Sequence, residues 1–454
     1  MANPAPVAEA PQPLLSPQQA VAIIVGIVIG AGIFGTPSLV AGIAGDAGWV
    51  VVAWVLGAVI SLAGALCYAE LATTYPHAGG DYHFLTRAFG RPVSFLYAWA
   101  RAMVINTGAI AILAFLFGDY VSRIAPLGAA SSAIWAAAII VVLTAVNIVG
   151  LQASARTQIV LTVIEVVGLV AVAIAGFVAT PEAASPPAFS STPAFGTLAF
   201  AMIFVLFTYG GWNEAAYISA ELKGGRRAIV PVLITSLAIL AVIYVVANIA
   251  MLNGLGLKGL AGSKAAGADV MARAFGPLGA QILSLIVAIA ALTSINATMI
   301  VGARTNYAMG RDWPALRFMG GWSAAKGTPV AALIVQAVIA LALVVFGSFQ
   351  NNGFKTMVEF TAPVFWTFLF LVGIALFRLR AKDAAIERPF RVPLYPITPV
   401  VFCAACAWLA YSSITYAASR SAVHIALIVM AVGVVALLIT RMKRSGSGPA
   451  IASD

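Results

Sequence analysis

Long apolar stretches alternate with short polar segments along nearly the whole chain. A helix needs about 20 apolar residues to cross a bilayer. Runs of that length occupy roughly residues 18–44, 48–73, 93–123, 132–150, 155–178, 195–222, 228–254, 276–303, 329–347, 356–378, 396–418 and 422–441. The pattern predicts an all-α integral membrane protein with twelve transmembrane helices, so both termini lie on one side. We expect the flanking segments, residues 1–17 and 442–454, to be disordered tails.

The first apolar run contains the stretch GAGIFG at residues 30–35, followed by Pro37. Lipid offers no hydrogen-bond partners, so a helix interrupted at membrane depth must line a cavity in the protein, where its free amides and carbonyls can bind a ligand. Close helix packing is the alternative, because Gly26 and Gly30 also form a small-xxx-small face. Taken alone, this stretch leaves the two interpretations open.

A second glycine pair, Gly210-Gly211, lies in the middle of the sixth run, about 180 residues later. Two breaks at matching positions of two five-helix halves favour an inverted-repeat transporter with its site at the membrane midplane. The predicted domain comprises a first repeat at about 18–178, a second at about 195–378, and two further helices at 396–441.

Composition and charge agree with this interpretation. Hydrophobic residues make up 62% of the chain and charged residues only 9%, which excludes a soluble protein of this length. With the N-terminus inside, 18 of the 25 Lys and Arg residues fall in inner loops and six in outer loops. The positive-inside rule therefore predicts cytoplasmic termini, in the plasma membrane or a bacterial inner membrane. It also explains the net charge of +10 without nucleic acid.

Nothing in the sequence indicates an enzyme, a metal site or a cofactor. Cys67, Cys403 and Cys406 all lie in apolar runs, so no extracellular disulfide framework is expected, and the C-x-x-C formed by the last two indicates helix packing. The three histidines have no metal-ligand spacing, and hydrolase and zinc-protease motifs are missing from the sequence.

We expect charged residues near the helix ends to have structural roles and no direct role in transport. We expect Glu70 to be an interfacial carboxylate, and Arg101 to snorkel or to pair with Glu70 or Glu221. Residues 81–90 predict a short amphipathic surface helix, and residues 255–275 an external half-helix or lid.

The chain resembles the amino acid–polyamine–organocation transporter superfamily, in its L-amino-acid transporter-like branch. The resemblance rests on IGAGIFGTP (29–37), YAELATTYPHAGGDY (68–82), FTYGGWNEAAYISAE (207–221), NYAMGRD (306–312) and RPFRVP (388–393). It implies the leucine-transporter fold, with broken first and sixth helices, and an α-amino-acid substrate. The implied substrate-binding residues at the two breaks are Val28, Gly30, Ala31, Gly32, Ile33, Phe207, Gly210, Gly211, Asn213 and Glu214.

In such proteins, amides at the first break bind the substrate carboxylate, aided by the positive end of a half-helix dipole. Carbonyl groups, here of Val28, Phe207 and Gly210, hold the ammonium group. Phe207 matches the aromatic gate that closes over the substrate. Asn106 and its neighbours are expected to set side-chain specificity. Glu214 has two interpretations, as a helix cap or as a substrate ligand.

Glu165 departs from the family pattern. Many relatives carry a Lys in the fifth helix where this chain has Glu165, and Ser294 matches the hydroxyl that faces this position. Burial disfavours the charged form of a carboxyl group. The hypothesis is therefore a proton-linked switch formed by Glu165 and Ser294. A permanently protonated core residue and a sodium ligand are the alternatives.

The predicted function is secondary transport of small to medium neutral L-amino acids by alternating access, as a symporter or antiporter, with H⁺ as the expected coupling ion. Cationic amino acids or polyamines, or exchange, form the alternative within transport, and a non-transporting amino-acid sensor is the alternative class. Animal relatives bond to a heavy chain through a Cys after the third helix. The loop at residues 122–132 has none, so no disulfide-linked partner is expected, and the chain is predicted to be a monomer or weak oligomer.

Overall fold

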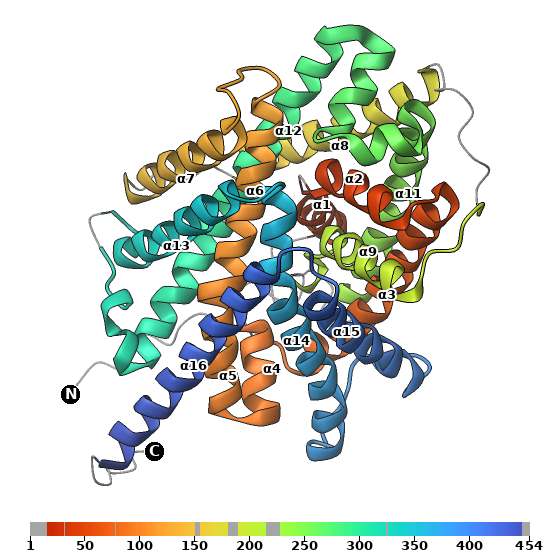
Figure 1. Cartoon of the computed structure of the whole chain (residues 1–454). Coiled ribbons are helices and arrows are strands. Elements are labelled where there is room, and N and C mark those ends of the chain that lie inside the picture. Colours follow the sequence, from red (N-terminus) through yellow and green to blue (C-terminus); the bar gives the residue numbers. More distant parts are fainter. Residues whose placement is uncertain are drawn as a thin grey trace.

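The structure is a computed structural model of the chain (Figure 1). It describes residues 16–30, 32–77, 79–149, 155–179, 189–214, 228–323 and 326–446. In these ranges the regular structure is helical, and one isolated bridge joins Ser323 to Thr328. The helices are α1 (Pro17–Val28), α2 (Gly32–Ala44), α3 (Ala47–Thr74), α4 (Gly80–Phe89), α5 (Arg91–Ala100), η1 (Arg101–Ile105), α6 (Asn106–Val121), α7 (Ser131–Val149), α8 (Ala155–Val178), α9 (Phe195–Thr208), η2 (Trp212–Glu214), α11 (Ile229–Gly262), α12 (Ala266–Asp312), η5 (Pro314–Met319), α13 (Val330–Ser348), α14 (Gly353–Lys382), α15 (Ile397–Thr415) and α16 (Arg420–Gly446).

Among the described residues, nine helices are long and apolar enough to cross a membrane, and α2, α9 and part of α8 are shorter apolar helices. The outer helices α7, α13 and α16 (Figure 1) carry exposed apolar side chains such as Val142, Val338 and Ile428. Acyl chains cover such a surface in a bilayer, and helices satisfy their own backbone groups there. The predicted all-α membrane architecture is confirmed at this level.

The first apolar run is broken where its glycines predict. Helix α1 ends at Val28 and α2 begins at Gly32, while the N–H of Gly30 donates to the carbonyl of Val28 at 2.7 Å in a tight turn. Ala31 lies outside the described residues. The backbone therefore leaves the helical ladder inside a membrane segment, as the glycine-rich sequence requires.

The sixth run is interrupted in a similar way. Helix α9 ends at Thr208, and the chain turns through Gly211, whose φ of 106° suits glycine, before η2. The predicted continuation of this run lies in residues 215–227, outside the described residues.

The interior is built around α12, α11 and α14. Helix α12 packs along α6 and α8, α11 packs against α3, α8 and α2, and α14 packs against α15 and α6. Helices α1, α2 and α9 lie in the middle of this arrangement (Figure 1). The two interrupted segments are thus surrounded by continuous helices.

One end of the bundle, here called the α4 end, holds α4 and the α14–α15 connection. The predicted surface helix at residues 81–90 is present as α4. Glu70 is 1% exposed and accepts hydrogen bonds from Arg380 Nε and from the backbone N–H of Val392, both at 2.7 Å. The Nε of Arg388 lies 3.5 Å from the same carboxylate. These bonds tie the RPFRVP segment to the end of α3.

The expected pairing of Arg101 with Glu70 is wrong, because Arg380 and Arg388 occupy that carboxylate. The guanidinium of Arg101 donates instead to the hydroxyl of Tyr97 at 3.2 Å. Glu221, the other expected partner, lies outside the described residues.

The opposite end, here called the Asp46 end, holds the α2–α3, α6–α7 and α11–α12 turns. Asp46 caps α3 and accepts backbone N–H bonds from Gly48 (2.8 Å) and Phe189 (3.0 Å). Burial raises the pKa of Asp46, but its backbone hydrogen bonds outweigh this and lower it to about 2. The predicted external half-helix at residues 255–275 is helical, with kinks at Gly256 and Gly276.

Candidate functional site

The last carbonyl groups of α1 and α9 meet at one tyrosine hydroxyl. The Tyr244 hydroxyl of α11 donates to the carbonyl of Val28 at 2.7 Å and lies 3.4 Å from the carbonyl of Thr208. Tyr244 is fully buried. Because helix C-termini carry partial negative charge, their meeting point favours a positive group or a hydrogen-bond donor. The sequence analysis missed Tyr244, although its phenol is one of few polar groups in an otherwise apolar run.

The start of α2 lies beside the same place. A side-chain carbon added at Gly32 would lie 3.8 Å from Thr208 Oγ1, and Thr208 donates to Thr36 Oγ1 at 2.8 Å. Ile33, the next residue of α2, is completely buried. The N-terminus of α2 presents amide groups and positive dipole charge. Opposite partial charges therefore flank one position between α1, α2 and α9, here called the break junction.

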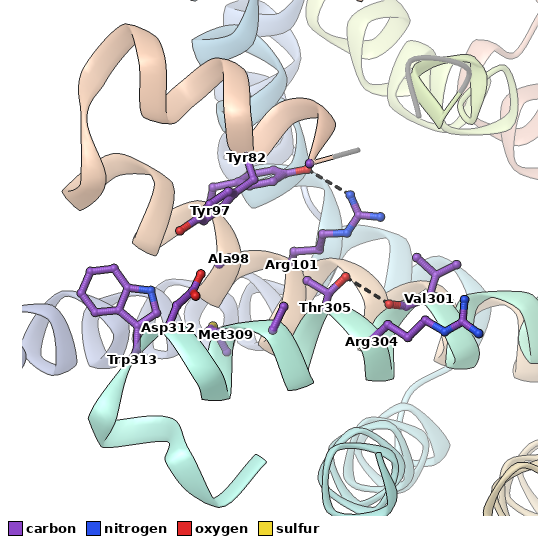
Figure 2. A pocket seen from close by; sticks show the side chains of 12 residues that line it. Tyr82, Tyr97, Ala98, Arg101, Val301, Arg304, Thr305, Met309, Asp312 and Trp313 are labelled. Carbon is purple, nitrogen blue, oxygen red and sulfur yellow. Dashed lines mark hydrogen bonds between the residues drawn. The ribbon is translucent and has the colours of Figure 1, made fainter. Parts of the chain in front are cut away.

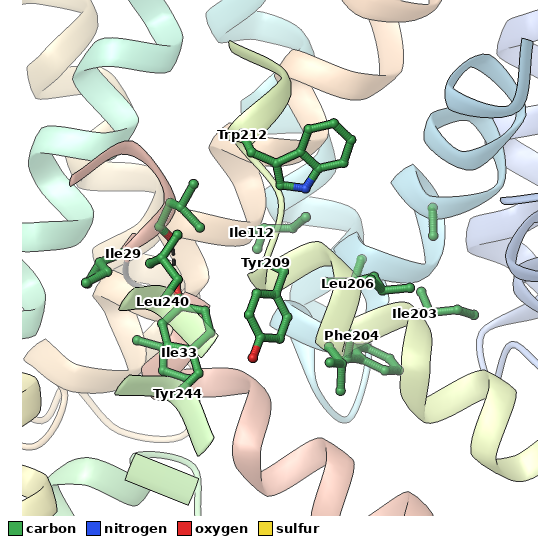
Figure 3. Packing of buried hydrophobic residues seen from close by; sticks show 14 of the residues in the cluster. Ile29, Ile33, Ile112, Ile203, Phe204, Leu206, Tyr209, Trp212, Leu240 and Tyr244 are labelled. Carbon is green, nitrogen blue, oxygen red and sulfur yellow. Dashed lines mark hydrogen bonds between the residues drawn. The ribbon is translucent and has the colours of Figure 1, made fainter. Parts of the chain in front are cut away.

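Apolar side chains form the surroundings of the break junction. Ile29, Ile33, Leu240 and Trp212 are all buried, and Figure 3 shows them with Tyr209 and Tyr244 between the interrupted segments. Such walls accept an apolar group and leave recognition of charge to the backbone.

The predicted gate residue Phe207 packs against α14. Its ring centroid lies 5.0 Å from that of Phe365 and 5.9 Å from that of Trp366. The carbonyl of Phe207 accepts a hydrogen bond from the N–H of Gly210 at 3.1 Å. The aromatic contacts hold the end of α9 against α14.

Gly210 and Asn213 line a small void of about 10 Å³ with Trp366, on the side of α3, α14 and α15. Gly211 forms the turn between α9 and η2. Glu214 ends η2, and its side chain lies outside the described part of the structure. The structure thus brings Val28, Gly32 and the end of α9 together and places Gly210 and Asn213 beside the neighbouring aromatic cluster.

Asn106 faces a different neighbour. A side-chain carbon added at Gly302 of α12 would lie 3.1 Å from Asn106 Nδ2 and 2.0 Å from Gln336 Oε1. The π-helix η1 comes directly before Asn106. Its wider turn changes the helical register of the residues that follow. Asn106 consequently lies at the contact of α6, α12 and α13.

Glu165 is 3% exposed on α8, and α8 packs against α11 and α12. Its Oε1 accepts a long hydrogen bond, 3.5 Å, from the hydroxyl of Thr293. Ser294, the predicted partner, is the next residue and is only half-buried. The described contact of Glu165 is therefore with Thr293 in place of Ser294. The described residues contain no cluster of three metal-ligating side chains.

A cavity of about 420 Å³ opens at the α4 end (Figure 2). It lies between the α4–α5 hairpin and the last turns of α12, and its wall includes Tyr82, Arg101, Arg304 and Asp312. Figure 2 shows Arg101 hydrogen-bonded to Tyr97 on this wall. Guanidinium groups and a carboxylate thus line this cavity at the α4 end.

Residues 15–442 match the sequence profile of the amino acid permease family. The chain belongs to this family. Interrupted helices, long apolar spans and buried polar groups at the break junction agree with that membership.

Curated relatives carry the same description. The chain is 28% identical over 383 residues to the b(0,+)-type amino acid transporter 1 of Mus musculus, covering 83% of this chain and 77% of the relative. It is 26% identical over 393 residues to the Asc-type amino acid transporter 1 of Mus musculus (84% and 72% covered). It is 27% identical over 394 residues to the large neutral amino acids transporter small subunit 2 of Mus musculus (84% and 73%). The permease is therefore an integral membrane protein. Its family and these relatives are transporters and not enzymes.

Proposed function

We propose that this permease is a secondary active transporter of small to medium neutral L-amino acids, coupled to protons. The observation that carries the proposal is the break junction, where Tyr244 contacts the carbonyl ends of α1 and α9 and the start of α2 lies beside Thr208. An amino acid carries one carboxylate and one ammonium group a few bonds apart. The two ends of the junction complement these charges.

In this account the carboxylate binds the amides of Ala31, Gly32 and Ile33, beside Gly30. The ammonium group binds carbonyl oxygens of Val28, Phe207 and Gly210. The carbonyl of Val28 accepts hydrogen bonds from Tyr244 and from the N–H of Gly30, and the carbonyl of Phe207 accepts from the N–H groups of Gly210 and Tyr209. Because a carbonyl has two lone pairs, the ammonium group would replace one of these donors on each. The buried apolar walls favour a neutral side chain over a cationic one.

Alternating access is the proposed mechanism. The cavity at the α4 end has a volume of about 420 Å³, while the aromatic contacts of Phe207 and the ion pair between Arg123 and Asp269 join helices toward the other end. This asymmetry supports a conformation that opens at the α4 end. By the positive-inside count that end is the cytoplasmic one, with both termini inside. The membrane would be the plasma membrane, or the inner membrane of a bacterium.

Proton coupling is assigned to Glu165. The Thr293 hydroxyl has one proton, which it donates either to the carbonyl of Ala290 at 2.8 Å or to Glu165 at 3.5 Å. Glu165 is 3% exposed, and burial at this depth disfavours a charged carboxylate. We therefore assign the proton-bound form to this conformation, and release of the proton would place a poorly compensated charge between α8 and α12. Ser294 is the next residue of α12 and lies about 100° further around the helix, so it would face Glu165 only after a rotation of α12.

The proposed architecture is the leucine-transporter fold, with inverted repeats at about 18–178 and 195–378 and two extra helices at 396–441. The breaks after Val28 and Thr208 fall 180 residues apart in the two halves, which supports this division. All three cysteines are buried, which supports a permease that works without a disulfide-linked heavy chain, as a monomer or weak oligomer.

Uptake of radiolabelled amino acids into proteoliposomes tests the proposal. With an imposed inward proton gradient, the purified permease should concentrate neutral amino acids above the external level. A proton ionophore should abolish this accumulation without abolishing exchange. Uptake confined to arginine, lysine or polyamines would contradict the neutral assignment. Amino-acid binding with no flux under any gradient would indicate a sensor.

A further inference from the structure

A second polar pocket, here called the Asp119 pocket, lies at the Asp46 end and is separate from the break junction. Its volume is about 120 Å³. Its walls come from α2, α6, the beginnings of α7 and α14, and the turn between α11 and α12. The residues that matter for its chemistry are Ser38, Asp119, Lys264 and Asn352.

The wall of the Asp119 pocket carries one charge of each sign. Among the described residues that line it, Asp119 is the one acidic residue and Lys264 the one basic residue. Lys264 is close enough to interact electrostatically with Asp119. Nearby, Arg123 is held in an ion pair with Asp269. Within the described ranges no carboxylate lies at ion-pair distance from Lys264, which is exposed. The pocket is thus lined by a carboxylate and an exposed ammonium group.

Ser38 adds a polar atom without a partner. Its side chain is 5% exposed, and its Oγ has no hydrogen bond to any described atom. A buried hydroxyl that makes no hydrogen bond costs free energy, and a ligand can supply the missing partner. Asn352 also lines the pocket, and its side chain is held in place because it accepts a hydrogen bond from the N–H of Lys355 at 2.9 Å.

The Asp119 pocket and the break junction lie in series along α2. Ser38 follows Gly32 by six residues, which is about 9 Å along a helix. Between them, Leu116 and Phe354 pack against Gly35, where an added side-chain carbon would lie 2.9 Å and 3.3 Å from them. Both side chains also line the pocket. A ligand in the Asp119 pocket would therefore be separated from the break junction by Leu116 and Phe354.

We propose that the Asp119 pocket is an access site for a small zwitterionic amino acid, which binds there before it passes Leu116 and Phe354. Asp119 binds the ammonium group, Lys264 binds the carboxylate, and Ser38 donates to or accepts from either. A volume of 120 Å³ corresponds to about four water molecules in the liquid, which suits a small amino acid and excludes a peptide. This inference rests on the proposed transport of amino acids.

The test compares initial uptake rates in proteoliposomes, with substrate added on the side of the Asp46 end. Asp119→Asn and Lys264→Gln should each raise KM about threefold to tenfold, as expected for loss of a charge-assisted contact at a weak site, while the maximal rate stays within twofold. Lys258→Gln is the matched control, since Lys258 is another exposed lysine outside the pocket. Because Lys264 is exposed, its variant should fold even if the Asp119 variant does not.

A ligand analogue separates the two roles. The methyl ester of the transported amino acid keeps the ammonium group and lacks the carboxylate charge. Inhibition of uptake by this ester should weaken in Asp119→Asn and stay unchanged in Lys264→Gln. Equal effects of both substitutions on the ester would overturn the assignment of the two charges.

The outcomes also distinguish this inference from the proposed function. If the wild-type permease takes up amino acids and both variants match Lys258→Gln in KM, the access site is refuted and the transport function stands. If the wild type takes up no amino acid, the proposed function falls and the inference falls with it.

Discussion

The phenolic oxygen of Tyr244 lies 2.7 Å from the carbonyl oxygen of Val28, so α11 is bonded to the last residue of α1. The same hydroxyl lies 3.4 Å from the carbonyl of Thr208, the last residue of α9. One donor thus serves two interrupted helices, although its single proton bonds only one of them at a time. Any ligand that donates to these carbonyls must share them with Tyr244.

Tyr244→Phe removes this donor and keeps the ring. We expect about a twofold to tenfold rise in KM for the amino acid, because the end of α1 is then no longer held to α11 at the junction, and such a net hydrogen bond contributes about 0.5–1.5 kcal/mol. Tyr209→Phe is the control, since the buried Tyr209 hydroxyl has no hydrogen bond to any described atom. Initial uptake rates measure the difference, and equal kinetics in both variants would argue against a role for the Tyr244 hydroxyl.

Glu165→Gln tests the coupling assignment. The amide is close to the protonated carboxyl group in shape and can still accept a hydrogen bond from Thr293, but it cannot release a proton. We expect amino-acid exchange to persist, and both proton-driven accumulation and the pH dependence of uptake to disappear. Glu387→Gln, in an exposed loop, should behave as wild type. Full concentrative uptake with unchanged pH dependence in Glu165→Gln would refute the switch.

Glu70→Gln should destabilise the α4 end. The substitution leaves Arg380 and Arg388 with a neutral partner at a site where Glu70 is 1% exposed. Removing one member of a buried ion pair costs about 3–5 kcal/mol. Thermal unfolding in detergent should show a clearly lower melting temperature than for Glu387→Gln. Equal melting temperatures would mean that the RPFRVP segment is held by other contacts.

Gly176→Ala should also destabilise the permease, through the contact of α8 with α11. An added side-chain carbon would lie 2.2 Å from the backbone oxygen of Ala250, which cannot move without shifting α11. Overpacking of this kind costs about 1–3 kcal/mol. Gly42→Ala is the matched control, because its added carbon would meet Ala261 at an ordinary 3.7 Å. A wild-type melting temperature for Gly176→Ala would contradict the close helix contact.

Features encoded by neighbouring residues were predictable from the sequence. The break after Val28 follows from glycines inside an apolar run, and α4 follows from an amphipathic stretch beside a turn. The partners of buried side chains were not predictable in the same way. Thr293 and Ser294 differ by one residue, or about 100° around a helix, and only the packing of α8 on α12 decides which one faces Glu165.

The direction of the Asn106 side chain was also not predictable from the sequence. Its direction depends on η1, a π-helix whose presence the sequence does not signal, and the altered register turns it toward Gly302 and Gln336. The role of Tyr244 was not predictable either. Its hydroxyl contacts two chain breaks that are 180 residues apart and meet only in the folded bundle. Long-range packing of this kind has no local sequence pattern.

We infer that an amino acid binds the break junction through both its charged groups. A thermal-stability screen of the purified permease would detect this binding, using neutral L-amino acids, their amides and the cationic amino acids and polyamines. Binding to the folded state raises the melting temperature by mass action. We expect stabilisation by a few neutral L-amino acids, and none by their amides, which lack the carboxylate. Equal stabilisation by the amides, or stabilisation only by cationic ligands, would refute binding through both charged groups.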